Sequence, residues 1–407
     1  MAEPSRSMQK LESPRAIVIS ALGITQILAW GSSYYLPAVL VQPIVETTGW
    51  PYGWVIGGLS LGLLVSGLVA IRVGRAIEHF GGRPVLAASA VLLTIGLTML
   101  TAAPNIPCYL AAWLVLGLAM GAGLYDAAFS TLGKLYGRNG RGAIARLTLW
   151  GGFASTVCWP LSAWLVEGIG WRGACLVYAA LHLAVTLPLH LCIIPREVRR
   201  IADSVKVVEP AVVSAVPDRG FPPAFVFGLL AVILTAGGTI SAILSVHIIA
   251  ILQSGGMALA VAVGFGALIG PAQVGARVVE MLIGNRHHPI WTLTASALLI
   301  ALGQVLLWNG NTILAIALIC YGAGNGLWSI ARGTLPLALF GSTGYAVLMG
   351  RLAMPSLIAQ SMAPSIGAVL METFGTMTML AVLTALAWLN VAGVAVLWLS
   401  TRRSVVN

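Results

Sequence analysis

The chain has 407 residues, of which 58% are hydrophobic and 8% are charged, and its mean hydropathy is +0.94. Because soluble domains carry about 25% charged residues, this composition excludes an ordinary soluble protein and predicts that lipid is the main solvent. The formal net charge of +10 would suit contact with either an anionic lipid surface or a nucleic acid.

Residues 1–15 form a short polar tail, and twelve apolar stretches follow it. A helix needs about 20 apolar residues to cross the hydrocarbon core, whereas a β-barrel strand is about 10 residues long and alternates strictly, so the pattern predicts helices. The first stretch is too long for the core of a cleaved secretory signal. The predicted spans are 16–43, 51–73, 84–102, 106–133, 143–167, 173–194, 222–250, 257–283, 289–308, 312–340, 345–370 and 376–400.

These spans fall into two groups of six. Residues 16–194 are predicted to form an N-terminal six-helix bundle and residues 222–400 a C-terminal one. The polar segment 195–221 between them mixes acids and bases and is predicted to be a flexible cytoplasmic linker, and residues 401–407 form a short tail. The predicted fold class is an all-α membrane protein with two pseudo-symmetric bundles.

The distribution of Lys and Arg predicts the orientation. If the amino terminus is inside, the outer loops contain a single basic residue, Arg172, whereas the inner segments contain several clusters. This bias places both termini in the cytoplasm of a multi-pass inner-membrane protein. The net positive charge therefore faces anionic lipid and is not a nucleic-acid site.

An internal repeat relates the two groups of spans. The segment 123–132 matches 326–335 at an offset of 203, with five identical residues and a Tyr-to-Trp exchange. Further matches at offsets of 202–205 pair Arg75, Glu78, Arg146, Pro160, Glu167 and Gly170 with Arg277, Glu280, Arg351, Pro364, Glu372 and Gly375. Since each half has an even number of spans, the repeat predicts a two-fold axis along the membrane normal, with the substrate site between the halves.

The segment 74–83, between the second and third spans, carries a charged turn between glycines. Its key residues are Gly74, Arg75, Glu78, Gly81 and Arg83. This pattern resembles the signature of the major facilitator superfamily, with Glu78 where that family usually has Asp. The Gly170-Trp171-Arg172 turn before the sixth span is also similar, and the resemblance covers the whole chain.

The resemblance implies a transporter that works by alternating access, distantly like monocarboxylate and organic-anion carriers. It implies a cavity lined mainly by spans one, four, seven and ten, and a gating role for the segment 74–83. In that role Glu78 would accept hydrogen bonds from Arg75, Arg83 or a nearby helix start and latch the cytoplasmic ends; a plain solvated turn is the alternative. Two patterns of proton-driven drug exporters are absent, because Trp113 and Trp159 replace the expected arginine and glycine.

Three charges are predicted to lie deep in the bilayer, where each costs roughly 2.5–3.5 kcal/mol on insertion scales. Asp126 lies in span four, Arg332 in span ten and Arg277 in span eight. Arg332 could bind a carboxylate bidentately, or it could form an internal salt bridge, for example with Asp126. Asp126 could carry the coupled proton, or it could be a structural partner of Arg332.

Arg277 lies within one helical turn of Glu280, and this spacing favours a structural latch. Some monocarboxylate carriers of the resembling superfamily use an arginine in span eight that follows an acid by four residues. Here that earlier position is Gln273, so the chain departs from that pattern.

Aromatic and polar residues share helical faces in the spans predicted to line the cavity. A pocket of rings with a few polar groups suits a small organic molecule, whereas an interfacial aromatic belt is the alternative. The belt fits Tyr34 and Tyr35, near the outer end, better than residues at mid-depth. The predicted cavity residues are Gln26, Trp30, Tyr125, Tyr321, Asn325 and Trp328.

No catalytic, cofactor or metal motif is present. The five cysteines are scattered without a CxxC pair, and neither an HExxH nor a GxxxxGK[ST] sequence occurs. The sequence therefore predicts no enzyme, no cofactor and no metal, and a protein that functions as a monomer. The predicted function is secondary transport of a small, anionic organic solute, coupled to protons or to exchange; the alternatives are efflux of a drug, metabolite or metalloid, an intramembrane enzyme, or a non-transporting sensor.

Overall fold

The computed structural model describes residues 6–196, 223–309 and 313–405. In these residues the chain is helical and contains no strand. The helices of the first half are α1 (Arg6–Gly31), α2 (Pro37–Thr48), α3 (Tyr52–Phe80), α4 (Gly82–Ala102), α5 (Ile106–Gly123), α6 (Tyr125–Tyr136), α7 (Gly140–Gly152), α8 (Ala154–Leu181) and α9 (Leu187–Cys192). Those of the second half are α10 (Pro223–Ser254), α11 (Leu259–Gly266), α12 (Ile269–Ile283), α13 (Pro289–Trp308), α14 (Leu314–Phe340), α15 (Tyr345–Phe374) and α16 (Thr376–Val405).

These helices account for twelve membrane crossings. Among the described residues nine helices are long and apolar enough to cross a membrane, and the bent α15 makes a tenth. The stretch Gly140–Cys192 is one of these nine helices, but the non-helical geometry of Gly170 divides it into two crossings. The apolar helix Arg15–Gly31, continued by α2, supplies the last one. The predicted all-α fold is confirmed.

Several predicted spans are broken helices. The chain leaves helical geometry between α1 and α2 and at Leu124 between α5 and α6, and a turn at Phe153 separates α7 from α8. The first span also differs from its prediction at its start, because α1 begins at Arg6 within the predicted polar tail. Such breaks free backbone groups within the membrane, which is tolerated where protein covers them.

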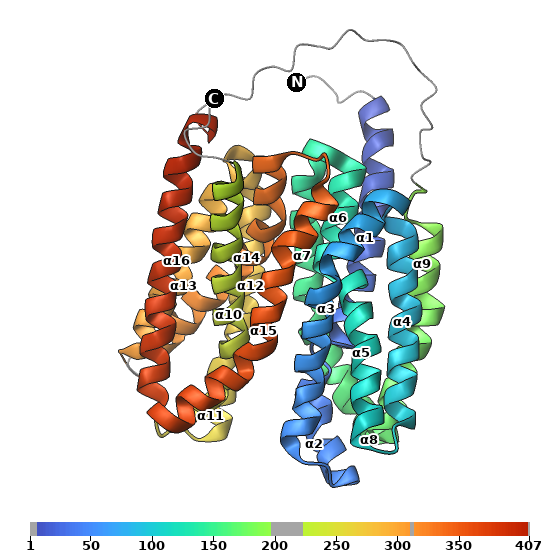
Figure 1. The fold of residues 1–407 in the computed structure, drawn as a ribbon, viewed down its shortest axis with the longest axis vertical. Coiled ribbons are helices and arrows are strands. Elements are labelled where there is room, and N and C mark those ends of the chain that lie inside the picture. Colours follow the sequence, from blue (N-terminus) through green and yellow to red (C-terminus); the bar gives the residue numbers. More distant parts are fainter. Residues whose placement is uncertain (1–5, 197–222, 310–312, 406–407) are drawn as a thin grey trace.

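The two halves of the chain form two bundles that lie side by side (Figure 1). α1–α9 make up one bundle and α10–α16 the other, and the two described ends of the chain lie on the same side of the molecule. We call this side the terminal face. The predicted linker 195–221 falls almost entirely in residues 197–222, outside the described residues.

The bundles meet along two seams that the internal repeat relates to each other. At the α3–α15 seam, Gly74 lies against the carbonyl of Ala346 and Gly350 against the carbonyl of Ala70, so closely that a Cβ at either glycine would collide with that oxygen. At the α7–α12 seam, a Cβ at Gly152 would instead collide with the guanidinium of Arg277.

The bundles are closed together towards the terminal face. One buried apolar cluster combines residues of the first half with four from the second, Leu337, Tyr345, Ala346 and Met349. On the opposite side of the membrane, Met362 and Phe374 of α15 and Trp54 of α3 are exposed. Burial of apolar surface between the halves therefore stabilises contact at the terminal face.

Candidate substrate and coupling site

Asp126 and Arg332 form a direct ion pair between the two halves. The Oδ1 atom of Asp126 accepts a hydrogen bond from Nη2 of Arg332, and the two side chains are only 18% and 10% exposed. Leu124 interrupts the fourth span, so Asp126 lies in the first turn of α6, where unpaired backbone N–H groups favour an acid. Of the two roles predicted for this pair, the structure shows the internal contact.

Aromatic packing fixes the position of Arg332. Its guanidinium carbon lies 5.1 Å from the centre of the Trp328 ring, one turn earlier on α14. Trp328 is itself confined by α10, because a Cβ at Gly237 would lie 2.6 Å from its Nε1 atom. A cation over an indole face is attracted by the ring quadrupole, so Trp328 and Asp126 together hold the guanidinium.

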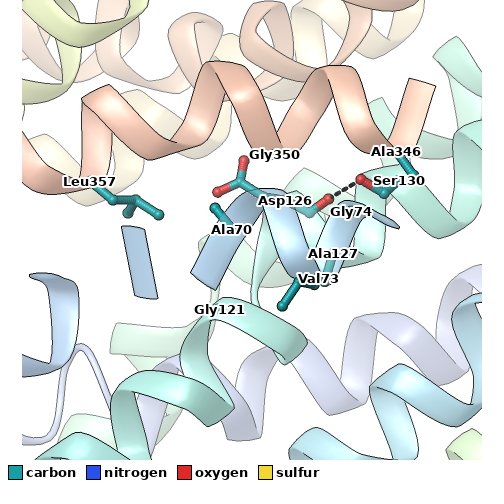
Figure 2. Close-up of a pocket in the computed structure, with 10 residues that line it drawn as sticks. All are labelled: Ala70, Val73, Gly74, Gly121, Asp126, Ala127, Ser130, Ala346, Gly350 and Leu357. Carbon is teal, nitrogen blue, oxygen red and sulfur yellow. Dashed lines mark hydrogen bonds between the residues drawn. The ribbon is translucent and has the colours of Figure 1, made fainter. Parts of the chain in front are cut away.

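A small cavity adjoins Asp126 at the α3–α15 seam (Figure 2). In Figure 2 the carboxylate of Asp126 points towards Gly350, and Ser130 donates to the carbonyl oxygen of Asp126 over 2.6 Å. Small side chains make up most of the wall, so the seam leaves free space beside the acid. The cavity is lined by Ala70, Val73, Gly74, Gly121, Asp126, Ala127, Ser130, Ala346, Gly350 and Leu357.

Arg277 is the second buried arginine, and its side chain is 5% exposed. It donates from Nε to the hydroxyl of Ser329 over 3.1 Å, from Nη1 to the carbonyl of Thr148 over 3.1 Å, and from Nη2 to Gln273 over 3.4 Å. All of these acceptors are neutral. Arg277 thus reaches from α12 into the first half and, among the described residues, has no carboxylate partner.

The predicted pair of Arg277 with Glu280 is not formed. Glu280 is bound instead by Arg141 of α7, over 3.4 Å, and by His287, over 3.4 Å, and it accepts from Thr292 over 2.7 Å. Arg141 also donates to the carbonyl of His287. Although positions 277 and 280 are neighbours on the helix surface, their side chains reach different partners: Arg277 turns inward and Glu280 faces the end of α7.

His288 contributes no charge to the contacts that Arg141, Glu280 and His287 form between the two bundles. Burial lowers the pKa of His288, and the electrostatic effects of Arg141 and the neighbouring His287 lower it further. A lowered imidazole pKa favours the neutral form near pH 7. The latch between the bundles at the terminal face therefore consists of Arg141, Glu280 and His287.

The segment 74–83 does not form the side-chain contacts predicted for it. Among the described residues, the exposed carboxylate of Glu78 pairs with neither Arg75 nor Arg83. Lys134 instead donates to the carbonyl oxygens of Ile77 and Glu78 over 3.0 and 2.7 Å, at the end of α3. Gly81 makes the turn into α4 with φ of 86°, a conformation that favours glycine.

The predicted residues of the first half gather in a ring cluster. Gln26 donates to the carbonyl of Gly123 over 2.6 Å and accepts from Trp30 over 3.1 Å. The Trp30 ring lies 5.0 Å from that of Tyr125, whose hydroxyl donates to Thr148 over 3.3 Å. Tyr125 and Arg277 therefore share one acceptor, the carbonyl of Thr148.

The structure adds Tyr34 and Tyr35 to this ring cluster. Their ring centres lie 5.2 and 5.9 Å from that of Trp30, and Tyr34 lies close to Ser245 of the other half. The interpretation of these tyrosines as an interfacial belt is therefore wrong. The break between α1 and α2 turns them inward; Gly31 at the end of α1 and Pro37 at the start of α2 are signals in the sequence that could have located it.

The predicted residues of the second half lie closer to α10. Asn325 accepts from Ser241 over 3.0 Å, and Tyr321 is buried beside the same serine. Tyr321 also lies near Tyr34 of the first half. The structure thus gathers three of the predicted cavity residues in each half, and of these Tyr125 and Tyr321 also lie close to residues of the other half.

Sequence reasoning missed two buried histidines in the sixth span. His182 lies 2.7 Å from Ser32 and 3.1 Å from Thr186, and His190 lies 3.1 Å from Thr25. Their signal was present, because residues 182, 186 and 190 follow helical spacing and share one face. They hold the sixth span to the first. Among the described residues, no group of His, Cys, Asp or Glu could hold a metal ion.

Comparison with known proteins identifies the fold. The family model described as Major Facilitator Superfamily matches residues 22–286. The transporter FucP in its outward conformation is similar at TM-score 0.68 and 11% identity, over 93% of this chain and 99% of that chain. The human organic anion transporter MFSD10 (TETRAN) is similar at TM-score 0.69 and 16% identity, over 93% of this chain and 99% of that chain. The proton:xylose symporter XylE is similar at TM-score 0.71 and 13% identity, over 94% of this chain and 95% of that chain.

One curated relative is similar in sequence over part of its length. It is named transcription regulatory protein OpdE, from Pseudomonas aeruginosa, and is 27% identical over 153 residues. The match spans 37% of this chain and 38% of that relative.

Proposed function

Because the chain belongs to the Major Facilitator Superfamily, a family of membrane solute transporters, we propose that it carries a small organic anion by alternating access. We place it in the inner membrane with the terminal face in the cytoplasm, in keeping with the basic residues of its inner segments. Arg277 is the single observation that carries the anion assignment.

A buried guanidinium without a counter-ion is costly. Neutral acceptors satisfy its hydrogen bonds but leave its charge uncompensated. Arg277 is in this situation, with Ser329, Thr148 and Gln273 as acceptors. A carboxylate that enters beside it supplies the missing charge and can accept two parallel hydrogen bonds.

The ring cluster supports an organic rather than an inorganic anion. Tyr125 shares the Thr148 carbonyl with Arg277, and Trp30 packs against Tyr125. Aromatic faces beside one charged group would hold the apolar body of a ligand while the arginine orients its carboxylate. In this role Trp30, Tyr34, Tyr35 and Tyr125 are substrate-contacting residues.

We assign proton coupling to the pair of Asp126 and Arg332. Protonation of Asp126 removes its negative charge and with it the ion pair that joins the two halves. The cavity beside the carboxylate, among the small residues of the α3–α15 seam, gives space for water to deliver the proton. Release of this pair, together with the Arg141–Glu280 contact, would let the terminal face open.

The test begins with binding. Purified protein is heated with a panel of small carboxylates and a panel of organic cations, and the shift in melting temperature is recorded. Carboxylates should stabilise the wild type, fail to stabilise Arg277→Gln, and still stabilise Arg146→Gln, because Arg146 is exposed and lies outside the site. Stabilisation by cations alone would overturn the anion assignment and favour drug efflux.

Flux in proteoliposomes then tests coupling. A carboxylate that binds should acidify or alkalinise the lumen, reported by an enclosed pH-sensitive dye, and Asp126→Asn should abolish that signal while binding persists. An unchanged dye signal in Asp126→Asn would overturn the coupling role. Binding with no flux would favour a sensor, the activity suggested by the name of the P. aeruginosa relative.

A further inference from the structure

Among the described residues, four exposed arginines in membrane-crossing helices have no hydrogen-bond or ion-pair partner. They are Arg72 and Arg75 of α3, Arg146 of α7 and Arg351 of α15. A guanidinium at the lipid-facing surface is costly unless it reaches an anion or the aqueous interface.

Two of these arginines flank the α3–α15 seam, and Arg72 lies about one turn before Arg75 on α3. Arg75 follows Gly74, which contacts Ala346, and Arg351 follows Gly350, which contacts Ala70. One residue corresponds to about 100° around a helix, so each arginine lies beside the contact rather than within it. The opposite flank of the seam faces the Asp126 cavity, and the exposed arginines therefore lie on the lipid side.

The three arginines are staggered in depth: the seam contacts put Arg351 level with residue 69, six residues or roughly 9 Å deeper than Arg75, with Arg72 between them. α3 runs towards the terminal face and α15 runs away from it, and the two contacts of the seam put Gly74 level with Ala346 and Ala70 level with Gly350. Arg75 lies five residues before the end of α3, and Arg351 lies six residues after the start of α15. At 1.5 Å per residue these are about 8–9 Å from the helix ends, within reach of lipid headgroups for a snorkelling side chain.

We propose that Arg72, Arg75 and Arg351 bind the phosphate headgroup of an anionic phospholipid in the leaflet at the terminal face. The lipid bridges the two bundles, because α3 belongs to one and α15 to the other. Guanidinium groups match phosphate geometry through paired hydrogen bonds, and juxtamembrane clusters of basic residues attract anionic lipid. Bound lipid therefore stabilises the closed α3–α15 seam.

The other seam offers an internal control. Arg146 is the repeat counterpart of Arg351, but no second exposed arginine accompanies it on α12. The counterpart of Arg75 there is Arg277, whose side chain is turned inward. Arg146 can meet lipid singly, whereas the α3–α15 seam presents three guanidiniums from two bundles.

Native mass spectrometry of the full chain tests this proposal. The protein is purified from nanodiscs that contain phosphatidylglycerol and phosphatidylcholine, and retained lipid is counted. We expect selective retention of phosphatidylglycerol, reduced about fivefold for each arginine removed in Arg75→Gln and Arg351→Gln and unchanged in Arg146→Gln. These positions are exposed, and a single gel-filtration peak verifies folding.

Three outcomes would overturn the proposal. Equal retention of both lipids would remove the anionic headgroup as the ligand, and equal loss in Arg146→Gln would show that any exposed arginine suffices. A rise in melting temperature with inorganic phosphate as large as that with phosphatidylglycerol would indicate a soluble anion site. None of these measurements involves carboxylate binding, so they stand or fall separately from the transport proposal.

Discussion

The two seams between the bundles occupy equivalent places in the repeat but differ in chemistry. Where α3 and α15 touch, the described contacts at Gly74 and Gly350 are made by glycine and alanine backbones rather than by charged side chains of these helices. The α7–α12 seam contains Arg277 and ends in the Arg141–Glu280–His287 latch. Backbone contacts through glycine cannot be rearranged by a change of charge, whereas ion pairs and buried hydrogen bonds can.

This difference suggests that the two seams have different roles in the movement of the bundles. The α3–α15 seam acts as a close-packed surface on which the bundles rock, and the α7–α12 seam responds to ligand charge. The two buried arginines differ in the same way: Arg332 has a carboxylate partner beside the first seam, and Arg277 has only neutral acceptors within the second. Substitutions that affect one seam and spare its counterpart test the comparison.

The largest effect is expected from a contrast between the two buried arginines. Arg332→Met leaves Asp126 without its counter-ion and should lower the free energy of unfolding by about 3–5 kcal/mol. Arg277→Met removes an uncompensated charge, so the melting temperature of ligand-free protein should stay equal or rise. Thermal unfolding of both purified variants provides the measurement, and the double change Asp126→Asn with Arg332→Met should recover part of the loss.

A large fall in stability for Arg277→Met would contradict this assignment. It would mean that the hydrogen bonds to Thr148 and Ser329 hold the seam together more strongly than the unpaired charge weakens it. The α7–α12 seam would then be structural, as the α3–α15 seam is, and the contrast between them would disappear.

The spans could be predicted from the sequence because their composition alone requires lipid as solvent. The meeting of Asp126 and Arg332 was also within reach, since the repeat places the two residues one turn apart on opposing helices. The partners of Arg277 and Glu280 could not be predicted from the sequence. Spacing along one helix allowed them to pair, and only the rotation of α12 against α7, which depends on contacts across the whole interface, directs them to Thr148 and Arg141.

The motif segment shows the same limit. Its pattern of glycines and charges correctly located a turn, but Arg75 faces outward while its repeat counterpart Arg277 faces inward. Sequence self-similarity fixes position along the chain to within a residue, and one residue changes direction by about 100° on a helix. The break that turns Tyr34 and Tyr35 inward lies between Gly31 and Pro37, a helix stop and start signal inside a stretch that is apolar enough to be predicted as one span.

The next effect concerns the backbone contact of the α3–α15 seam. Gly74→Val places side-chain carbons against the carbonyl of Ala346, which cannot move without its helix, and should cost about 1–3 kcal/mol of stability or more. Gly57→Val on the same helix is the control, since a Cβ there meets nothing within 4 Å. Equal melting temperatures for the two variants would show that the seam is loosely packed.

The latch at the terminal face should have a smaller effect. Glu280→Gln removes the charge that Arg141 and His287 share and should cost about 1–2 kcal/mol, because the acid is buried and hydrogen-bonded to a charged group. Glu78→Gln, at the repeat counterpart, should leave stability unchanged, since that carboxylate is exposed. Thermal unfolding distinguishes the two, and a similar loss in both would assign a latch to each seam.

The smallest effect is expected where the ring cluster meets the α7–α12 seam. Tyr125→Phe removes one long hydrogen bond to Thr148, so stability should fall by about 0.5 kcal/mol, while a carboxylate that stabilises the wild type should stabilise this variant less. Tyr109→Phe removes a 2.8 Å bond to the carbonyl of Val55, away from both seams. It should lower stability somewhat more and leave the ligand-induced shift intact. If Tyr109→Phe reduced that shift as much as Tyr125→Phe, the loss would reflect a weakened bundle, and Tyr125 would have no particular connection to Arg277.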